Sequence, residues 1–287
     1  MRPFTIYGRL QQQFPDQQQK LISLILELIQ PDKIYLLGAT LKRRRTESIF
    51  QPDAPAAHET SEYFLLVLMD KLDDKPLYEW QDRLEQKCQQ LNFVTVIVLE
   101  TAKFSEGLLR GDMFSRKILQ NSPLIYNSSD IHFDLPSEFD EEETKKAIEK
   151  NYQDGLKKAQ EFIVGAELFR IRNQNKLAAF LLHQAAEQCL RALLKVGIGI
   201  NQTTHNLDRL IRCASMISYR MPEIFPRNTD KEKKLFTILN KAYSDARYDK
   251  DYSVQTADLV LIFDRVCRMV EILIEFKKNA QLAHAIN

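Results

Sequence analysis

The sequence lacks the features that mark a membrane or exported protein. No apolar run approaches the roughly eighteen residues that a membrane-spanning helix requires. The N-terminus, MRPFTIYGRLQQQFPDQQQ, lacks the apolar core of a signal peptide. Hydrophobic residues make up 44% of the chain and charged residues 28%, as in ordinary globular proteins. We therefore expect a soluble, cytoplasmic protein with no membrane contact.

Metal-ligating cysteine pairs and a surplus of positive charge are also missing. The four cysteines are widely separated and form no C-x-x-C pair, so neither a zinc site nor a disulfide framework is expected; they are Cys88, Cys189, Cys213 and Cys267. A net charge of +1 excludes a strongly basic protein that coats nucleic acid. Any phosphate recognition must therefore come from local patches, and we predict no metal and no cofactor.

The length of 287 residues is enough for two domains of ordinary size, although one large domain is also compatible with it. Hydrophobic periodicity disappears between Asn127 and Glu143, where Ser, Asp and Pro gather before an acidic run. We place the boundary here and predict one domain over residues 1–135 and a second over residues 136–287.

The first domain reads as an α/β sheet covered by helices. Strand-like apolar runs alternate with helical patterns, and the first strand is expected to end at a turn beginning with Gly38. The predicted strands are Lys33–Leu37, Tyr63–Met69 and Phe93–Leu99, with a last one near Tyr126, and the predicted helices are Gln17–Gln30, Pro76–Gln90 and Ser105–Leu119.

The second domain reads as helix throughout, apart from its loops. Gly197 and Gly199 are expected to end its second helix, and Thr204 is the expected N-cap of its third. The predicted helices are Glu143–Ile171, Gln174–Lys195, Asn206–Met216, Lys231–Tyr243 and Ser253–Lys278.

One helix of the second domain carries a regular polar row as well as an apolar face. His183, Glu187 and Arg191 are four residues apart, as is the following Lys195, so they project from one side of the helix. This helix, the segment Thr204-His205-Asn206-Leu207 and the later turn Ala246-Arg247-Tyr248 together resemble the HEPN family of all-helical domains, which bind nucleotides or cleave RNA. The resemblance covers roughly residues 150 to 280.

The strand order of the first domain resembles the nucleotidyltransferase fold, whose small members often accompany HEPN domains. That family carries Gly-Ser in a turn, Asp-x-Asp on the next strand and a third carboxylate later, which hold metal ions and phosphates. Here Gly38 is followed by Ala39, Glu62 and Phe64 stand for the two aspartates, and Thr95 stands for the third carboxylate. Because an aromatic ring cannot ligate magnesium, we predict that this domain is catalytically degenerate.

The connection after Gly38 contains four adjacent cations, Lys42-Arg43-Arg44-Arg45. Such a run is able to bind phosphate, but it lacks interleaved aromatic residues for base stacking. We interpret it as a solvated loop.

In ribonucleases of the HEPN family, an Arg is followed four to six residues later by a His. The imidazole moves a proton and the guanidinium stabilises charge on phosphorus. This chain has Arg247, but Tyr252 occupies the fifth position on, and a phenol is a poor base at neutral pH. The resemblance therefore implies nucleotide or RNA binding rather than catalysis, with ligand contacts from Arg247, Tyr248, Asp251, Tyr252, His183, Glu187 and Arg191.

Two alternatives stay open. The chain is a ribonuclease if His183, His205 or a second subunit supplies the missing imidazole. It is a scaffold if Arg247 merely pairs with nearby aspartates and Glu187 pairs with Arg191. The resemblance also implies a homodimer with the Arg247 regions facing each other. The apolar stripe of the last helix is expected to serve the bundle core or a dimer seam; it comprises Leu259, Ile262, Phe263, Val266, Val270, Leu273 and Ile274.

Overall fold

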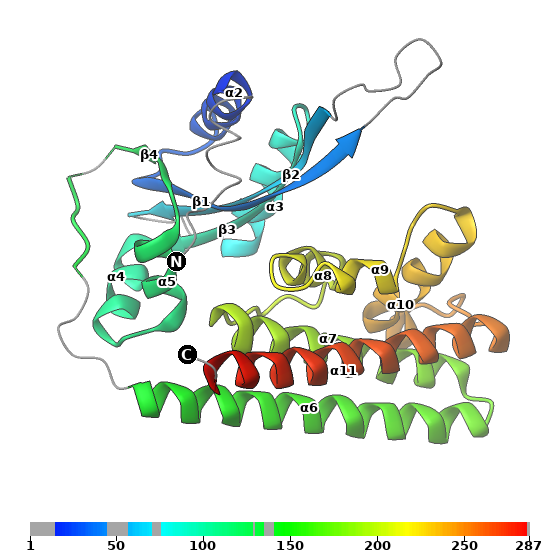
Figure 1. Cartoon of the computed structure of the whole chain (residues 1–287). Helices are drawn as coiled ribbons and strands as arrows, with labels where there is room; N and C mark the ends of the chain where they lie inside the picture. The colour runs from blue at the N-terminus through cyan, green and yellow to red at the C-terminus, as the bar shows by residue number, and fades with distance from the viewer. Residues whose placement is uncertain (1–14, 45–56, 71–75, 129, 135–140, 286–287) are drawn as a thin grey trace, which may run out of the picture. The chain divides into compact units, whose positions relative to one another are not determined.

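A computed structural model of the chain describes residues 15–44, 57–70, 76–128, 130–134 and 141–285. The chain divides into two compact units, Met1–Phe139 and Asp140–Asn287. The first holds a sheet with helices and the second is all helical, which confirms the predicted fold class at this level (Figure 1). Within the described residues, no helix is both long and apolar enough to span a membrane.

The N-terminal unit is built on a four-stranded sheet in the order β3-β2-β1-β4. β1 pairs antiparallel with both β2 and β4, whereas β2 and β3 run parallel. The parallel pair is joined through a helix, as a crossover connection requires. The strands are β1 (Lys33–Arg44), β2 (Ala57–Met69), β3 (Phe93–Glu100) and β4 (Leu124–Asn127).

The predicted end of the first strand at Gly38 is wrong. β1 runs through Gly38 as far as Arg44, because β2 pairs with it along that length, with shifts in register between Leu36 and Gly38 and between Thr40 and Leu41. Most of the basic run therefore lies at the end of a strand rather than in a loop, while Arg45 lies outside the described residues.

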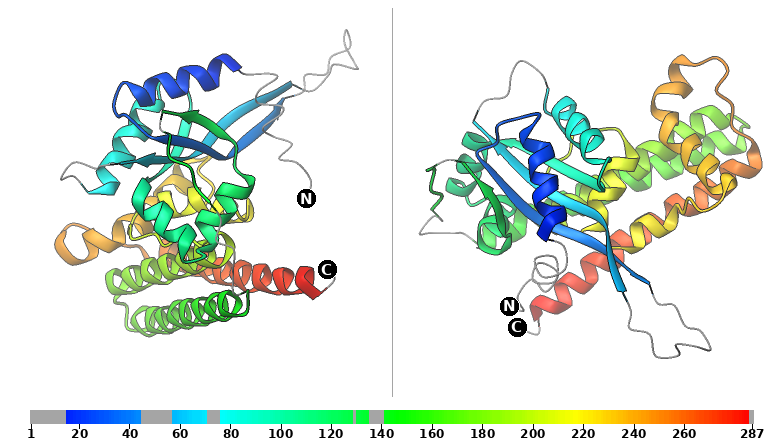
Figure 2. Two further views of the ribbon diagram at one scale, coloured as in Figure 1. Left: turned by 90° about the vertical axis from the view of Figure 1, so that its left-hand side faces the viewer. Right: turned by 90° about the horizontal axis from the view of Figure 1, so that it is seen from above.

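Helices cover both faces of the sheet (Figure 2). α2 (Pro15–Leu26) and α3 (Leu77–Cys88) share one face, where Leu21, Trp80 and Leu84 pack into a core with alternate strand residues. α4 (Thr101–Leu109) packs on β2 and β3, and its Phe104 ring stacks on Tyr35, 6.2 Å between centres. Alternation of side chains along each strand thus supplies two buried layers.

The single helix predicted over Ser105–Leu119 is in fact two, α4 and α5 (Met113–Asn121). Gly111 has a φ of 72°, which breaks the first helix. Asp112 then caps the second helix, its carboxylate accepting the Ser115 N–H at 3.2 Å.

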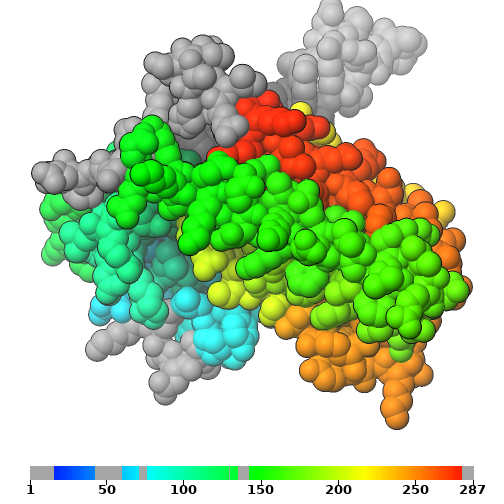
Figure 3. Space-filling model, turned by 90° about the horizontal axis from the view of Figure 1, so that it is seen from below, coloured from blue at the N-terminus to red at the C-terminus, as the bar shows by residue number. Residues whose placement is uncertain are grey.

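The C-terminal unit is a bundle organised around α7 (Asn175–Ile198), which packs against four of its other helices. α6, α7 and α11 lie side by side in the views of Figures 1 and 2, and α6 and α11 share the face shown in Figure 3. The other helices of the unit are α6 (Glu141–Ile171), α8 (Leu207–Ser215), α9 (Arg220–Ile224), α10 (Asp230–Tyr248) and α11 (Thr256–Ala285).

Several helix ends differ from their predictions. Asn206, not Thr204, caps α8, because its side-chain oxygen accepts the N–H of Asp208 at 2.9 Å. α10 continues past Tyr243, so that Arg247 lies in its last turn rather than in a loop. α9 has only five residues and was not predicted.

The stripe predicted on the last helix faces the bundle interior. Leu259, Ile262, Val266 and Leu273 are completely buried within the unit. Gly199 ends α7 in the left-handed conformation, with φ of 83°, whereas Gly197 remains helical. The stripe therefore serves the core of the bundle.

Candidate functional site

The polar row of α7 leads from the bundle interior toward its surface. The side chains of His183 and Glu187 are 0% and 1% exposed, whereas that of Arg191, one turn further on, is 25% exposed. A buried carboxylate is costly unless charged or hydrogen-bonding groups surround it. The row is therefore a buried polar network, not the exposed stripe that its spacing alone would suggest.

Glu187 is the centre of this network. Its Oε1 lies 3.0 Å from Nη2 of Arg191. Its Oε2 accepts a hydrogen bond from Nδ1 of His205 at 2.8 Å and lies 3.6 Å from Nε2 of His183. Burial raises the pKa of Glu187, but its contacts with the two histidines and the charge of Arg191 outweigh burial and lower the pKa below its usual value. Glu187 is therefore ionised at neutral pH.

His183 ties α7 to α10. Its Nδ1 donates a hydrogen bond to the carbonyl oxygen of Leu239 at 2.9 Å, and a carbonyl can only accept, so the proton sits on Nδ1. Nε2 then faces Glu187 at a distance too long for a hydrogen bond. Since the ring is fully buried, His183 contacts a ligand only through its neighbours.

His205 reaches the same carboxylate from the loop before α8. Its side chain is 44% exposed, and its ring stacks on Tyr243 of α10, with centres 4.0 Å apart and planes 13° from parallel. Because Nδ1 is bound to Glu187, Nε2 is the nitrogen left for other contacts. Tyr243 was missed from sequence; its signal was the four-residue spacing to Arg247.

Arg191 fixes the loop that carries His205. Its Nη2 donates to the carbonyl oxygens of Thr203 and Thr204, each at 3.0 Å, as well as contacting Glu187. One guanidinium thus joins the buried carboxylate to the backbone just before His205.

Arg247 lies on the exposed side of Tyr243. Its Nε donates to the Tyr243 carbonyl oxygen at 2.7 Å, and its guanidinium carbon lies 4.2 Å from the Tyr243 ring centre and 4.9 Å from that of Tyr248. Tyr248 is 79% exposed. In the part of the chain that the structure describes, no carboxylate forms an ion pair with Arg247. We call Tyr243, Arg247, Tyr248 and His205 the Arg247 surface.

The remaining predicted ligand residues follow α10. Tyr252 is 9% exposed and its hydroxyl donates to the Ile238 carbonyl oxygen at 2.9 Å, while burial strongly raises its pKa. Asp251 is exposed, and its N–H donates to Asp249. Lys176 of α7 donates to the carbonyl oxygens of Asp249 and Lys250, which holds this loop against the bundle.

The structure gathers most of the predicted residues of the N-terminal unit. Gly38 pairs with Phe64, and Thr95 pairs with Phe64 from the other side. The Thr95 hydroxyl donates to Glu62 at 2.7 Å. Ala39 instead packs toward the core under α2 and α3. Among the described residues, no group of three or more His, Cys, Asp or Glu side chains is arranged to hold a metal ion.

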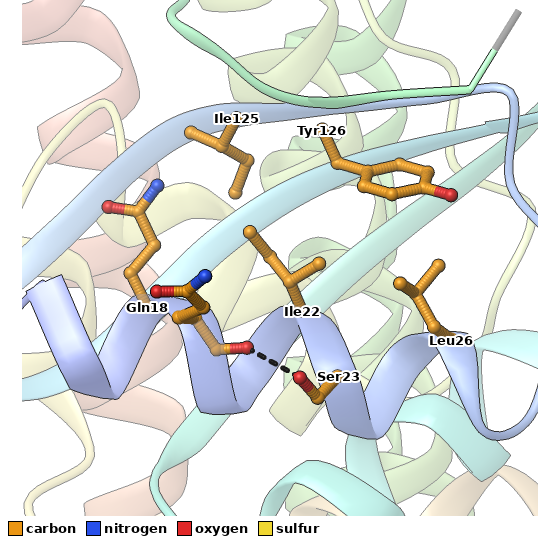
Figure 4. A pocket seen from close by; sticks show the side chains of 7 residues that line it. Gln18, Ile22, Ser23, Leu26, Ile125 and Tyr126 are labelled. Atoms are coloured by element: carbon orange, nitrogen blue, oxygen red, sulfur yellow. Dashed lines mark hydrogen bonds between the residues drawn. The ribbon is translucent and has the colours of Figure 1, made fainter.

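A groove of ≈ 690 Å³ lies between α2 and β4 of the same unit (Figure 4). The described residues that line it carry no charge; they are Gln18, Gln19, Ile22, Ser23, Leu26, Ile125 and Tyr126. These residues therefore offer a phosphate no charged partner.

Comparisons with known proteins agree with the helical architecture of the second unit. Residues 152–279 match the family model described as HEPN domain. A solved structure of a nucleotidyltransferase-like protein from Exiguobacterium sibiricum 255-15 is 10% identical, with 88% of this chain and 73% of that chain covered and a TM-score of 0.27. No curated protein matches the chain. The match to the family model places a HEPN domain at residues 152–279 of this protein.

Proposed function

We propose that the HEPN domain binds a nucleotide or RNA through a phosphate group at the Arg247 surface. The observation that carries this proposal is the state of Arg247: one N–H is used by the helix, the guanidinium lies over Tyr243, and no described carboxylate pairs with it. The remaining N–H groups suit the oxygens of a phosphate, which a guanidinium binds in bidentate fashion.

The neighbouring side chains support the same ligand class. Tyr248 offers an exposed ring on which a base can stack. Arg247 and His205 both pack against the ring of Tyr243. His183, Glu187 and Arg191 lie behind this surface and fix it, while Tyr252 and Asp251 belong to the loop that follows it.

The test is the affinity of the purified protein for a short fluorescent single-stranded RNA and for AMP, measured by anisotropy and calorimetry. Arg247→Ala should weaken binding at least tenfold, because it removes hydrogen bonds to a charged group worth about 1.5–3 kcal/mol. Arg268→Ala, which removes an exposed cation of α11, is the matched control and should leave affinity unchanged. Equal affinities of wild type and Arg247→Ala would contradict the proposal.

A second candidate function is RNA cleavage, which the His205–Glu187 pair favours. A carboxylate bound to Nδ1 orients an imidazole so that Nε2 can accept a proton. In this reaction Nε2 of His205 takes the proton of a ribose 2′-hydroxyl, the 2′ oxygen bonds to phosphorus, and the bond to the 5′ oxygen breaks. The departing 5′ oxygen takes up a proton from solvent water, leaving a 2′,3′-cyclic phosphate and a 5′-hydroxyl, while Arg247 stabilises the charge on phosphorus.

End-labelled RNA distinguishes the two functions. Cleavage to a 2′,3′-cyclic phosphate that disappears in His205→Asn and in Arg247→Ala supports the ribonuclease. Intact RNA that is nevertheless bound supports binding alone.

We also propose that the N-terminal unit is a degenerate nucleotidyltransferase. Phe64 is buried, Thr95 donates its hydroxyl to Glu62, and Ala39 has no hydroxyl. A set with one carboxylate falls short of what two-metal chemistry uses. Transfer of a labelled nucleotide from ATP with magnesium, to the protein itself or to RNA, would contradict this part of the proposal.

We further propose that the protein acts in the cytoplasm as a homodimer formed by its HEPN domains. Support comes from the family, and from exposed apolar residues at the start of α11, Val260 and Leu261, which are 46% and 40% exposed. Light scattering with size-exclusion chromatography measures the mass directly. A particle of 33.5 kDa would be a monomer and would contradict the dimer.

A further inference from the structure

The loop that carries His205 is held from beneath by a buried charge. Glu187 is 1% exposed, and both of its oxygens are engaged, one with His205 and the other with Arg191. Arg191 in turn binds the carbonyl oxygens of Thr203 and Thr204. Glu187 thus joins α7 to the loop that carries His205 both directly and through Arg191.

We propose that Glu187 is a positioning residue that holds His205 as a second phosphate-binding group, across the Tyr243 ring from Arg247. This inference rests on the proposed binding function and names a further residue of the same site. Both groups contact one ring: the His205 ring centre is 4.0 Å from that of Tyr243, and the Arg247 guanidinium carbon is 4.2 Å from it. His205 stacks flat on the ring and the guanidinium lies over it at a similar distance, so the two groups occupy opposite faces of Tyr243. An RNA that places one phosphate at Arg247 can therefore place a neighbouring phosphate at His205, on the other side of the ring.

The hydrogen bond to Glu187 decides which nitrogen of His205 titrates. Nδ1 keeps its proton because it faces an ionised carboxylate at 2.8 Å, so the second proton is gained or lost at Nε2. Protonated Nε2 donates a hydrogen bond to a phosphate oxygen. Deprotonated Nε2 presents a lone pair to the same oxygen. Ligand affinity should therefore fall as His205 loses its proton.

The charged and titratable groups around His205 come from two helices. α7 contributes Glu187, with Arg191 and His183 on its other sides, and α10 contributes Tyr243 and Arg247. Of these groups, Glu187 makes the direct 2.8 Å contact with His205, whereas Arg191 contacts the other carboxylate oxygen and Arg247 lies beyond the Tyr243 ring.

The experiment uses a 2′-O-methyl RNA oligonucleotide without terminal phosphates. It lacks the hydroxyl needed for cleavage, and its phosphodiesters stay singly charged between about pH 5.5 and pH 8, so any change in affinity comes from the protein. Affinity for the full-length chain is measured by anisotropy across this range. The wild type should bind about tenfold more weakly at the upper end, which corresponds to the loss of one charge-assisted hydrogen bond.

Two substitutions isolate the role of Glu187. In His205→Asn the amide nitrogen takes the place of Nδ1 and keeps a donor toward Glu187, but the side chain does not titrate; affinity should be low and constant across the range. Glu187→Gln removes the charge at nearly constant volume and should weaken binding at low pH and flatten the profile. Arg247→Ala should bind weakly at every pH while keeping the slope of the wild type.

The outcomes separate this inference from the function it rests on. A flat profile for the wild type, or an unchanged slope in His205→Asn, overturns the role of Glu187 and His205 and leaves binding by Arg247 intact. Equal affinities of wild type and Arg247→Ala overturn the binding function itself. Thermal unfolding of each variant shows whether it is folded, and His205→Asn decides the question if Glu187→Gln does not fold.

Discussion

At the scale of single residues, Glu187 has the most demanding environment of the candidate site. Its carboxylate is buried and contacts Arg191 and His205 directly. Glu187→Ala should lower the free energy of unfolding by about 3 kcal/mol, because it leaves charged and polar groups without their partner. Chemical denaturation measures this loss. Glu161→Ala on the exposed side of α6 is the control and should change stability by less than about 0.5 kcal/mol.

The lowered pKa of Glu187 predicts that the stability of the fold depends on pH. The pKa of Glu187 in the folded protein lies below its ordinary value of 4.5. A carboxyl with a lowered pKa stabilises the fold above its unfolded pKa, and this contribution is lost as the pH falls through the folded pKa. Unfolding measured from about pH 3 to pH 7 should therefore show a smaller acid-induced loss in Glu187→Gln than in the wild type. Identical slopes for the two proteins would contradict this linkage.

Tyr243 is expected to act through its ring rather than its hydroxyl. The centre of the Tyr243 ring lies 4.0 Å from the centre of the His205 ring and 4.2 Å from the guanidinium carbon of Arg247. Tyr243→Phe should bind RNA as the wild type does, whereas Tyr243→Leu should bind about three- to thirtyfold more weakly, since stacking and cation–π contacts are each worth about 0.5–2 kcal/mol. Anisotropy with the same RNA checks both, and a loss in Tyr243→Phe would show that the hydroxyl matters.

The sequence predicted the polar row of α7 but not its burial. The spacing places His183 and Glu187 on one face of the helix. That this face is buried follows only from contacts with distant residues, of His183 with Leu239 and of Glu187 with His205. The four-residue spacing between Tyr243 and Arg247 is visible in the sequence, but the contact of Tyr243 with His205 is not, because His205 lies 38 positions earlier and single-sequence patterns report neighbours within one element.

At the scale of elements, α6 and α7 depend on a close approach at Gly155. A Cβ added there would lie 2.5 Å from Cβ of Ala192, whereas one added at Gly165 would meet only the flexible end of Leu181 at 3.0 Å. Gly155→Ala should destabilise the unit by about 1–3 kcal/mol through overpacking. Gly165→Ala is the matched control and should be neutral or stabilising by up to about 1 kcal/mol, because alanine favours helix. Chemical denaturation measures the stability of both variants. Equal curves for Gly155→Ala and Gly165→Ala would contradict the prediction, because they would mean that α6 and α7 can move apart without loss of stability.

Long elements were predictable and their ends were not. The helical periods of α7 and α11 span many turns and their predictions overlap the observed helices closely. β1 was cut short at Gly38 because a glycine usually marks a turn, and only pairing with a distant β2 shows that the strand continues. The extension of α10 through Arg247 was missed because Asp245 and Asp249 resemble turn residues.

At the scale of the whole molecule, the two compact units each contain a core of their own. Leu65 is completely buried in the N-terminal core and Glu187 in the C-terminal unit. Scanning calorimetry should therefore show two transitions, one shifted down by Leu65→Ala and the other by Glu187→Ala. A single transition that both substitutions shift equally would mean that the units unfold together.

The division of the chain into an α/β half and a helical half followed from periodicity alone, because sheets and bundles bury side chains at periods of 2 and 3.6. The HEPN family match adds the identity of the second half. The likeness of the first half to nucleotidyltransferases stays a prediction, since Gly38, Glu62, Phe64 and Thr95 show where the residues lie but not what they bind.

The central claim is that a phosphate ligand binds at Arg247 and His205, and nuclear magnetic resonance tests it most directly. Titration of the labelled full-length protein with the 2′-O-methyl RNA should shift the Nε–Hε signal of Arg247 and the Cε1–Hε1 signal of His205, and leave that of Arg268 in place. Saturable binding with no change at Arg247 or His205 would place the ligand elsewhere and contradict the claim.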